Sequence, residues 1–195
     1  MHGGGKPGSE PGNEPSDWVQ RWAHLIRPQG SVLDVACGGG RHVHWLAARG
    51  FVLTGVDRDG AALATLGTVA ETIEADIEHA AWPLAERRFD AVVVTNYLWR
   101  ELLPTLVQSL NPGGVLIFET FADGQQSVGR PSRPDFLLRR GELLRATETL
   151  RLVAFEEGFI EAPARYVQRV VAVAEAAGTV LARYTLATCT AGRGA

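Results

Sequence analysis

The sequence of 195 residues predicts a single α/β domain of the doubly wound kind, whose mostly parallel sheet ends in an antiparallel hairpin. Three observations support this fold class. Short apolar runs alternate with helical segments through most of the chain. These runs are apolar on successive residues, which is typical of strands that helices cover on both faces. Two further strand-like runs near the end have no helix between them, so we expect them to pair antiparallel.

The first expected element is a helix over residues 17–27, because Trp18, Trp22 and Ile26 recur at four-residue spacing. Ser16 or Asp17 can cap its start, and Pro28 ends it. Five strands should follow in one sheet, at 31–37, 51–56, 72–75, 89–95 and 115–121. The connections predict helices at 41–49, 61–69 and 98–110, with a turn at 111–114.

The two ends of the chain differ from this pattern. Residues 1–16 hold five glycines and three prolines, so we expect a disordered tail there and one folded domain over 17–195. The elements expected after the fifth strand are a loop at 122–140, a helix at 141–147, and hairpin strands at 150–155 and 166–174. The pattern at 178–195 fits either another strand or a loose extension.

Composition and charge exclude several classes of protein. A hydrophobic content of 46% and a charged content of 21% exclude a fully disordered chain, and only two cysteines, Cys37 and Cys189, argue against a disulfide scaffold or a zinc site. The formal net charge of −3 provides no general attraction to nucleic acid or anionic membranes. Because no apolar run approaches the ~18 residues that span a bilayer, we expect a cytoplasmic protein that binds neither membranes nor nucleic acid.

The strongest local signal is a strand, a glycine turn and the start of a helix, with Gly38, Gly39 and Gly40 at the turn. Such a turn lets a nucleotide approach the backbone. Asp57, which ends the next strand, can accept hydrogen bonds from both ribose hydroxyls. A dinucleotide fingerprint needs glycine at position 43, where this chain has Val43. Asp34 would repel a pyrophosphate but can hold the cationic amino end of S-adenosylmethionine, so charge favours the second ligand.

These residues resemble motif I of the class I S-adenosylmethionine-dependent methyltransferases, in the variant D-x-x-C-G-x-G, through Asp34, Cys37, Gly38 and Gly40. The resemblance spans about residues 17–175 and continues through Asp57, Ala75-Asp76-Ile77, Trp82-Pro83-Leu84, Phe89-Asp90 and Leu110-Asn-Pro-Gly-Gly114. It implies a seven-stranded, mostly parallel sheet whose last strand inserts antiparallel. Ala36 stands where many members have glycine.

The resemblance also implies a cofactor, S-adenosylmethionine, and the residues that bind it. The glycine turn would line the methionine part together with Asp34 and Ala36. Asp57 would bind the ribose with Arg58 beside it. Asp76 would accept from the adenine amine, and the backbone of Ile77 would face the ring. Asn96 and Tyr97 would lie beneath the reacting methyl group.

No dedicated catalytic residue is required, because methyl transfer from a sulfonium is an in-line displacement at an activated carbon. If the acceptor must lose a proton, Tyr97 and Glu119 are the nearest candidates in the sequence. Trp99 is a candidate wall of the acceptor pocket. Arg130 and Arg133 are candidates for a lid that attracts an anionic acceptor, the alternative being a solvated loop. His42 is expected to be solvated.

The acceptor is expected to be a small molecule. The N-P-P-Y signature of many nucleic-acid and protein methyltransferases is absent, since 95–98 reads Thr-Asn-Tyr-Leu. Residues 118–144 resemble the small tellurite-resistance-type methyltransferases, which act on small molecules that include metalloid oxyanions. The alternatives are a nucleic-acid or protein methyltransferase, an NAD-dependent oxidoreductase, and a binding protein of this fold without catalysis.

Overall fold

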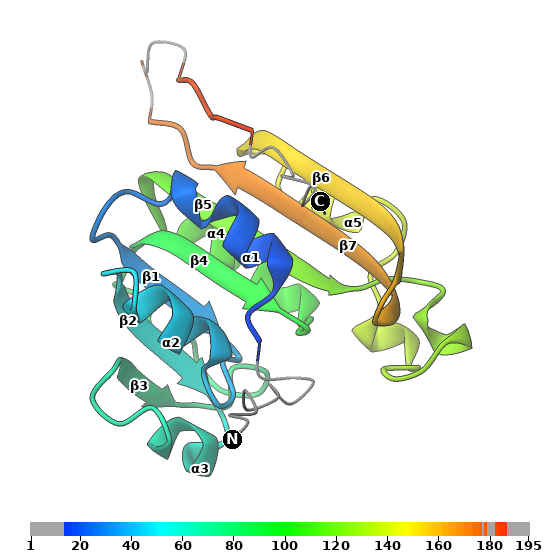
Figure 1. The fold of residues 1–195 in the computed structure, drawn as a ribbon, viewed down its shortest axis with the longest axis horizontal. Coiled ribbons are helices and arrows are strands. Elements are labelled where there is room, and N and C mark those ends of the chain that lie inside the picture. The colour runs from blue at the N-terminus through cyan, green and yellow to red at the C-terminus, as the bar shows by residue number, and fades with distance from the viewer. Residues whose placement is uncertain (1–13, 177, 179–181, 187–195) are drawn as a thin grey trace, which may run out of the picture.

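A computed structural model of the protein describes residues 14–176, 178 and 182–186. Seven strands form one sheet in the order β3-β2-β1-β4-β5-β7-β6 (Figure 1). Neighbouring strands from β3 to β5 are parallel, whereas β7 runs antiparallel to both β5 and β6. The predicted fold class is therefore confirmed. Residues 1–13 of the expected tail lie outside the described residues, and Ser16 is a buried residue that caps the first helix.

The parallel strands are β1 (Ser31–Val35), β2 (Val52–Asp57), β3 (Glu71–Glu74), β4 (Phe89–Thr95) and β5 (Leu110–Phe121). The hairpin strands are β6 (Arg151–Glu161) and β7 (Ala164–Val173). The helices are α1 (Asp17–Trp22), α2 (Arg41–Ala47), α3 (Gly60–Ala64), α4 (Leu103–Gln108) and α5 (Glu142–Ala146). Short 3-10 turns cover Ala23–Leu25, Arg100–Leu102, Gln125–Ser127 and Pro134–Phe136. None of the helices in the described ranges is both long and apolar enough to cross a bilayer.

The core consists of two apolar layers, one on each face of the sheet. Strand β4 is buried along its whole length, with Val92 and Val94 in one layer and Ala91 and Val93 in the other. Figure 1 shows α1 and α2 in front of the sheet and α4 and α5 behind it. Burial on both faces explains why the strands are apolar on successive residues.

The hairpin differs from its predicted boundaries. Strands β6 and β7 are separated only by Ala162 and Pro163, so residues 156–161 and 164–165 form strand rather than loop. Gly158 lies inside β6 without ending it. The rings of Phe159 in β6 and Tyr166 in β7 pack against each other, with their centroids 4.9 Å apart. Cross-strand packing of this kind stabilises a ladder that the glycine and proline appeared to interrupt.

Other sequence predictions also need correction. The helix expected at 61–69 covers only Gly60–Ala64, and the helix expected at 17–27 ends at Trp22 and continues as a 3-10 turn to Leu25. Residues 111–114 belong to β5, where the pairing with β4 shifts register between Phe89 and Ala91, rather than to a separate turn. The helix expected at 98–110 begins as a 3-10 turn and continues as α4, which has a proline in its first turn. Residues 182–186 form no strand, and the remainder of the undecided segment, apart from residue 178, lies outside the described residues.

Candidate active site

The carboxyl ends of β1, β2 and β4 meet at one edge of the sheet, where the glycine turn lies. The backbone of this turn has positive φ at Ala36 (54°), Gly38 (52°) and Gly40 (72°). A Cβ at Gly40 would overlap the Cδ2 atom of buried Leu66, so packing and backbone conformation both require glycine there. A Cβ at Gly39 would meet no atom within 4 Å, which leaves room for a ligand against the backbone.

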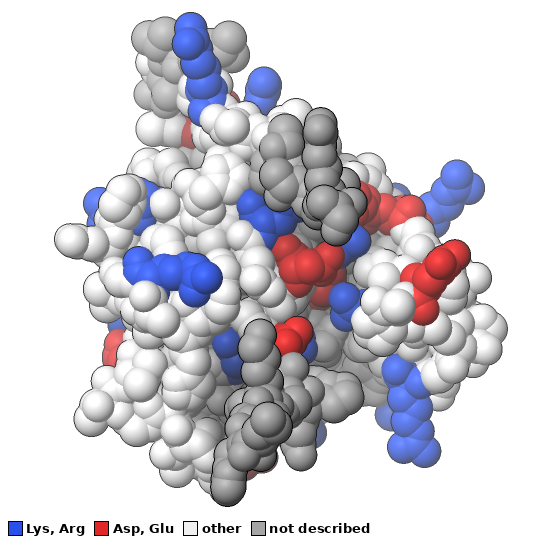
Figure 2. Space-filling model, in the orientation of Figure 1, with Lys and Arg blue, Asp and Glu red and all other residues white. Residues whose placement is uncertain are grey.

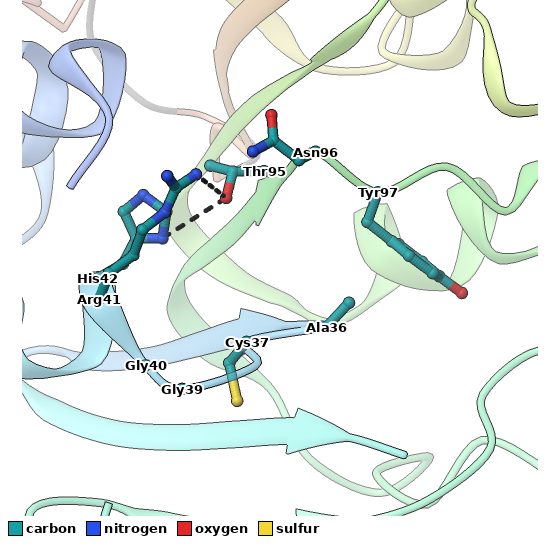
Figure 3. Close-up of a pocket in the computed structure, with 9 residues that line it drawn as sticks. All are labelled: Ala36, Cys37, Gly39, Gly40, Arg41, His42, Thr95, Asn96 and Tyr97. Atoms are coloured by element: carbon teal, nitrogen blue, oxygen red, sulfur yellow. Dashed lines mark hydrogen bonds between the residues drawn. The ribbon is translucent and has the colours of Figure 1, made fainter. Parts of the chain in front are cut away.

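Two adjoining cavities open at this edge. The larger, of about 440 Å³, is lined by Ala36, Cys37, Gly39, Gly40, Arg41, His42, Thr95, Asn96 and Tyr97 (Figure 3). The smaller, of about 180 Å³, is lined by Ala36, Asp57, Arg58, Ala75, Asp76, Ile77, Glu78 and Tyr97. The two cavities share Ala36 and Tyr97. Asn96, like Ala36, is a non-glycine residue with positive φ (56°), and such strain is common at functional sites.

Asp57 connects the end of β2 to the glycine turn. Its Oδ2 atom accepts a hydrogen bond from the backbone N–H of Gly38 at 2.7 Å, and its Oδ1 atom accepts from the N–H of Asp59 at 2.9 Å. A carboxylate has about four acceptor positions, so further lone pairs remain for a ligand in the smaller cavity.

Asp76 bounds the other end of the smaller cavity. Its Oδ1 atom accepts from the N–H groups of Glu78 and His79, and its Oδ2 atom lies 3.1 Å from Nδ1 of His79. The hydrogen bond from the Glu78 N–H is the main cause that lowers the pKa of Asp76, so this carboxylate is ionised at neutral pH. Ile77 is buried beside it.

Asp34 lies under the glycine turn and is only 1% exposed. Burial raises the pKa of Asp34 to about 7, against the opposing effect of the nearby Arg41 guanidinium. Its Oδ2 atom has no hydrogen-bond partner among the described residues, and Nδ1 of His42 lies 3.8 Å away. An unpartnered buried acceptor is costly, and Asp34 itself lines neither cavity.

His42 was expected to be solvated, and this expectation is wrong, because the side chain is 2% exposed. Its Nε2 atom accepts from the backbone N–H of Ser16 at 3.1 Å, which places the ring proton on Nδ1, 3.5 Å from Oγ1 of Thr95. Burial and the adjacent Arg41 lower the pKa of His42 to about 3. Both ring nitrogens are therefore engaged, and the ring is neutral at physiological pH. The four-residue spacing to buried Leu46 was the signal in the sequence.

Glu119 lies in β5 beside the larger cavity but lines neither cavity. The side chain is fully buried. One oxygen accepts from the Ser16 hydroxyl at 3.0 Å and lies 3.5 Å from Nη2 of Arg165, and the other accepts from Nη1 of Arg169 at 3.0 Å. None of these three partners was predicted from the sequence: residue 16 was expected at the end of the tail and residue 165 in a loop, and Arg169 lies in a predicted strand whose neighbour could not be read from the sequence.

Of the residues predicted to face the acceptor, only Tyr97 lines the cavities. Burial, followed by the nearby Glu78 carboxylate, raises the pKa of Tyr97, so its hydroxyl is protonated at neutral pH. Trp99 packs beside His79, with ring centroids 5.9 Å apart, and lines neither cavity. Arg130 and Arg133 also line neither, and exposed Arg133 forms an ion pair of 3.0 Å with Asp135 in the same loop.

Comparison with known proteins agrees with this arrangement. Residues 32–114 match a family model described as a methyltransferase domain, whereas none of the curated protein sequences matches the chain. Among solved structures, TehB from Haemophilus influenzae is similar with a TM-score of 0.63 and 22% identity; the match covers 80% of this chain but only 61% of TehB. An S-adenosylmethionine-dependent methyltransferase from Mesorhizobium loti gives a TM-score of 0.64 at 17% identity, covering 83% of this chain and all (100%) of that one.

NodS, an N-methyltransferase from Bradyrhizobium japonicum WM9, gives a TM-score of 0.61 at 19% identity, covering 80% of this chain and 96% of that one. At these identities, the structural likenesses show the fold, and the family match covers the segment that carries the glycine turn and Asp57. Residues 32–114 are therefore similar to a methyltransferase domain, and the whole sheet has the fold of S-adenosylmethionine-dependent methyltransferases.

Proposed function

We propose that the two cavities bind S-adenosylmethionine end to end, and that its methyl group passes to a small-molecule acceptor in the larger cavity. The observation that carries this proposal is the adjoining pair of cavities, which share Ala36 and Tyr97. The smaller cavity has the carboxylates that the adenosine end needs, and Asp34 lies just beneath the glycine turn of the larger one, where it would repel the pyrophosphate of a dinucleotide.

The methionine end would lie along the glycine turn, formed by Gly38, Gly39 and Gly40. The unpartnered Oδ2 atom of Asp34 would accept from its ammonium group, and Asn96 would lie beside it. A positive charge close to Asp34 favours the ionised carboxylate, which offsets the cost of its burial.

The adenosine end would occupy the smaller cavity. Asp57 would accept from the ribose hydroxyls through its remaining lone pairs, with Arg58 at the rim. Asp76 would accept from the adenine amine, and the Ile77 backbone would face the ring. This assignment uses the carboxylates at the ends of β2 and β3, which are adjacent in the sheet.

When bound, the cofactor supplies a methyl group on a sulfonium, already activated for displacement. The protein would align the acceptor with this carbon and exclude water. No ionised base faces the larger cavity in the described part of the chain: His42 is neutral with both nitrogens engaged, Tyr97 is protonated, and Glu119 is held by Ser16 and Arg169. We infer that the acceptor brings its own lone pair and loses any proton to water.

A cavity of about 440 Å³ is of the size that holds small molecules. Such a cavity, which must also hold part of the cofactor, favours a small acceptor over a nucleic-acid or protein segment. NodS, which shares the fold, is by name an N-methyltransferase. With no span in the described residues and an acidic composition, we keep the cytoplasm as the proposed location.

The cofactor assignment is tested by calorimetry with S-adenosylhomocysteine and with NAD(H). We expect the wild-type protein to bind S-adenosylhomocysteine and not NAD(H). Asp57→Ala should weaken that binding by about 1.5–3 kcal/mol, because the ribose hydroxyls lose a charged acceptor. Binding of NAD(H) alone would overturn the proposal.

Asp59→Ala provides the matched control. Asp59 lies two residues away and caps α3 by accepting from the N–H groups of Ala61 and Ala62, and it lines neither cavity. Its loss should reduce stability by about 1 kcal/mol while leaving the affinity for S-adenosylhomocysteine unchanged. Equal losses of affinity in both variants would mean that Asp57 acts only through the local fold. Release of S-adenosylhomocysteine from S-adenosylmethionine with a panel of small thiols, amines and carboxylates then tests the acceptor class.

A further inference from the structure

Guanidinium groups outnumber carboxylates where β5 and β7 meet α1 and α2. Arg169 contacts Glu119, Glu156 and Asp17, and Arg21 contacts Glu156, all at 3.0–3.3 Å. Figure 2 shows acidic and basic side chains together near the middle of this face. With Arg41 and Arg165 added, the cluster comprises Arg21, Arg41, Arg165 and Arg169 against Asp17, Glu119 and Glu156. Its four guanidinium groups face three carboxylates, so one guanidinium in the cluster has no carboxylate of the cluster to itself.

Arg41 is the member of this cluster that lines the larger cavity. It is the first residue of α2, and Figure 3 shows its side chain beside His42, pointing toward Thr95. Its one hydrogen bond within the described chain is from Nη2 to Oγ1 of Thr95, at 3.5 Å, and no described carboxylate lies within ion-pair distance of it. A guanidinium has five N–H donors, so most of the donors of Arg41 face the cavity or water.

Arg165, at the start of β7, is close enough to Arg41 to repel it electrostatically. Its side chain is 16% exposed, its Nη2 atom is 3.5 Å from Oε1 of Glu119, and its buried Nε has no hydrogen-bond partner in the described residues. Burial, together with repulsion from Arg165, lowers the pKa of Arg41 against the attraction of Asp34 and Glu119. Glu119 is shared with Arg169, so it does not neutralise both guanidinium groups near the cavity.

We propose that Arg41, supported by Arg165, binds a carboxylate of the methyl acceptor in the larger cavity. The proposal rests on the function proposed above and adds the chemical class of the acceptor. A guanidinium matches a planar carboxylate with two parallel hydrogen bonds. Because only one guanidinium of the cluster lacks a carboxylate of its own and Asp34 lies near Arg41, a singly charged anion fits better than a doubly charged phosphate.

The carboxylate serves as a point of attachment and not as the methylated atom. Its lone pairs are engaged by the arginine, which makes it a poor nucleophile, so the methyl group goes to another atom of the acceptor that carries a lone pair. The acceptors that fit this site are therefore small amino or thiol carboxylic acids.

The test uses the S-adenosylhomocysteine complex and four small aromatic probes that differ in charge: benzoate, phenyl phosphate, benzamide and benzylamine. Binding is followed by NMR through the Nε–H resonance of Arg41. We expect benzoate to bind most tightly and to shift this resonance. Arg41→Gln should weaken benzoate binding about 10–100-fold, as for the loss of a charge-assisted hydrogen bond, and Arg165→Gln should weaken it less. Arg49→Gln, an exposed arginine just beyond the other end of α2, should leave it unchanged.

The cofactor also carries a carboxylate, so a second measurement determines whether Arg41 binds the carboxylate of the acceptor or that of the cofactor. Arg41→Gln is titrated with S-adenosylhomocysteine and with methylthioadenosine, which lacks the amino-acid end. If the variant weakens S-adenosylhomocysteine alone, and benzoate does not bind the wild-type complex, Arg41 serves the cofactor and the proposal is overturned. Tighter binding of phenyl phosphate or benzylamine than of benzoate also overturns it. Failure of the wild-type protein to bind S-adenosylhomocysteine would instead overturn the proposed function.

Discussion

Gly40 is fixed by two independent constraints at the position where the glycine turn becomes α2. Its φ of 72° is unfavourable for a residue with a side chain, and a Cβ would overlap Leu66, which is 1% exposed and cannot easily move. We predict that Gly40→Ala lowers the free energy of unfolding by about 2–4 kcal/mol, from backbone strain and overpacking together. Urea denaturation measures this loss.

A double mutant separates the two causes. In a Leu66→Ala background, the overlap is gone, so the added cost of Gly40→Ala should fall to the backbone part, about 1–2 kcal/mol. If the cost is the same in both backgrounds, packing against Leu66 does not constrain the turn, and only the conformation of the backbone requires glycine.

Among single residues, the sequence could indicate those whose place in the site depends on neighbours close along the chain. The glycine turn, Asp34 and Asp57 could be predicted as candidates because their spacing from strand ends is fixed along the chain. His42 and Arg165 could not, because their positions depend on packing between distant segments. His42 is buried by the start of α1, and Arg165 reaches the site only because β7 inserts beside β5.

Among the elements, the loop between β5 and α5 depends on one arginine. Arg100 donates to both oxygens of Glu142, at 2.6 and 3.0 Å, and to the backbone oxygens of Asp135 and Leu137, each at 2.7 Å. Both side chains of the ion pair are partly buried. We predict that Arg100→Met destabilises the protein by about 2 kcal/mol and speeds amide exchange at residues 134–142, while exchange in β4 changes little.

The control for this prediction is a double-mutant cycle with Glu142→Gln. Each single substitution removes the same ion pair. The sum of the two single losses in the free energy of unfolding should therefore exceed the loss in the double mutant by about 1 kcal/mol or more, as is usual for residues in contact. A coupling close to zero would contradict the assignment of Arg100 as the residue that holds this loop.

The elements also show where sequence periodicity is informative. Strand β4 was predicted at its observed bounds, 89–95, because burial on both faces leaves an unbroken apolar run. The β6–β7 hairpin was predicted with the right pairing but the wrong length, since β6 is at the edge of the sheet and largely exposed. An exposed edge strand carries polar residues, so the hydrophobic pattern of the sequence does not mark where the strand begins and ends.

For the whole molecule, stability against pH should reflect two buried neighbours with opposite behaviour. Burial raises the pKa of Asp34 from 3.8 to about 7, so the folded state holds a proton that the unfolded state has lost, and stability falls as pH rises from about 4 to 7. Burial lowers the pKa of His42 from 6.5 to about 3, so stability rises with pH over that window. Between about pH 4 and 6.5 the two effects oppose each other.

Asp34→Asn separates these effects, because it removes the dependence of stability on pH that is due to Asp34 and leaves the dependence that is due to His42. In the cofactor-free protein, the stability of the variant relative to wild type should increase by about 1.4 kcal/mol per pH unit between pH 4 and 7 and stay constant above pH 7. Groups elsewhere cancel in this difference, which urea denaturation at pH 5, 6, 7 and 8 measures. A difference that does not change from pH 5 to 7 would mean that Asp34 is already ionised in the folded protein. Its unpartnered oxygen would then need no ammonium group from the cofactor to offset its burial.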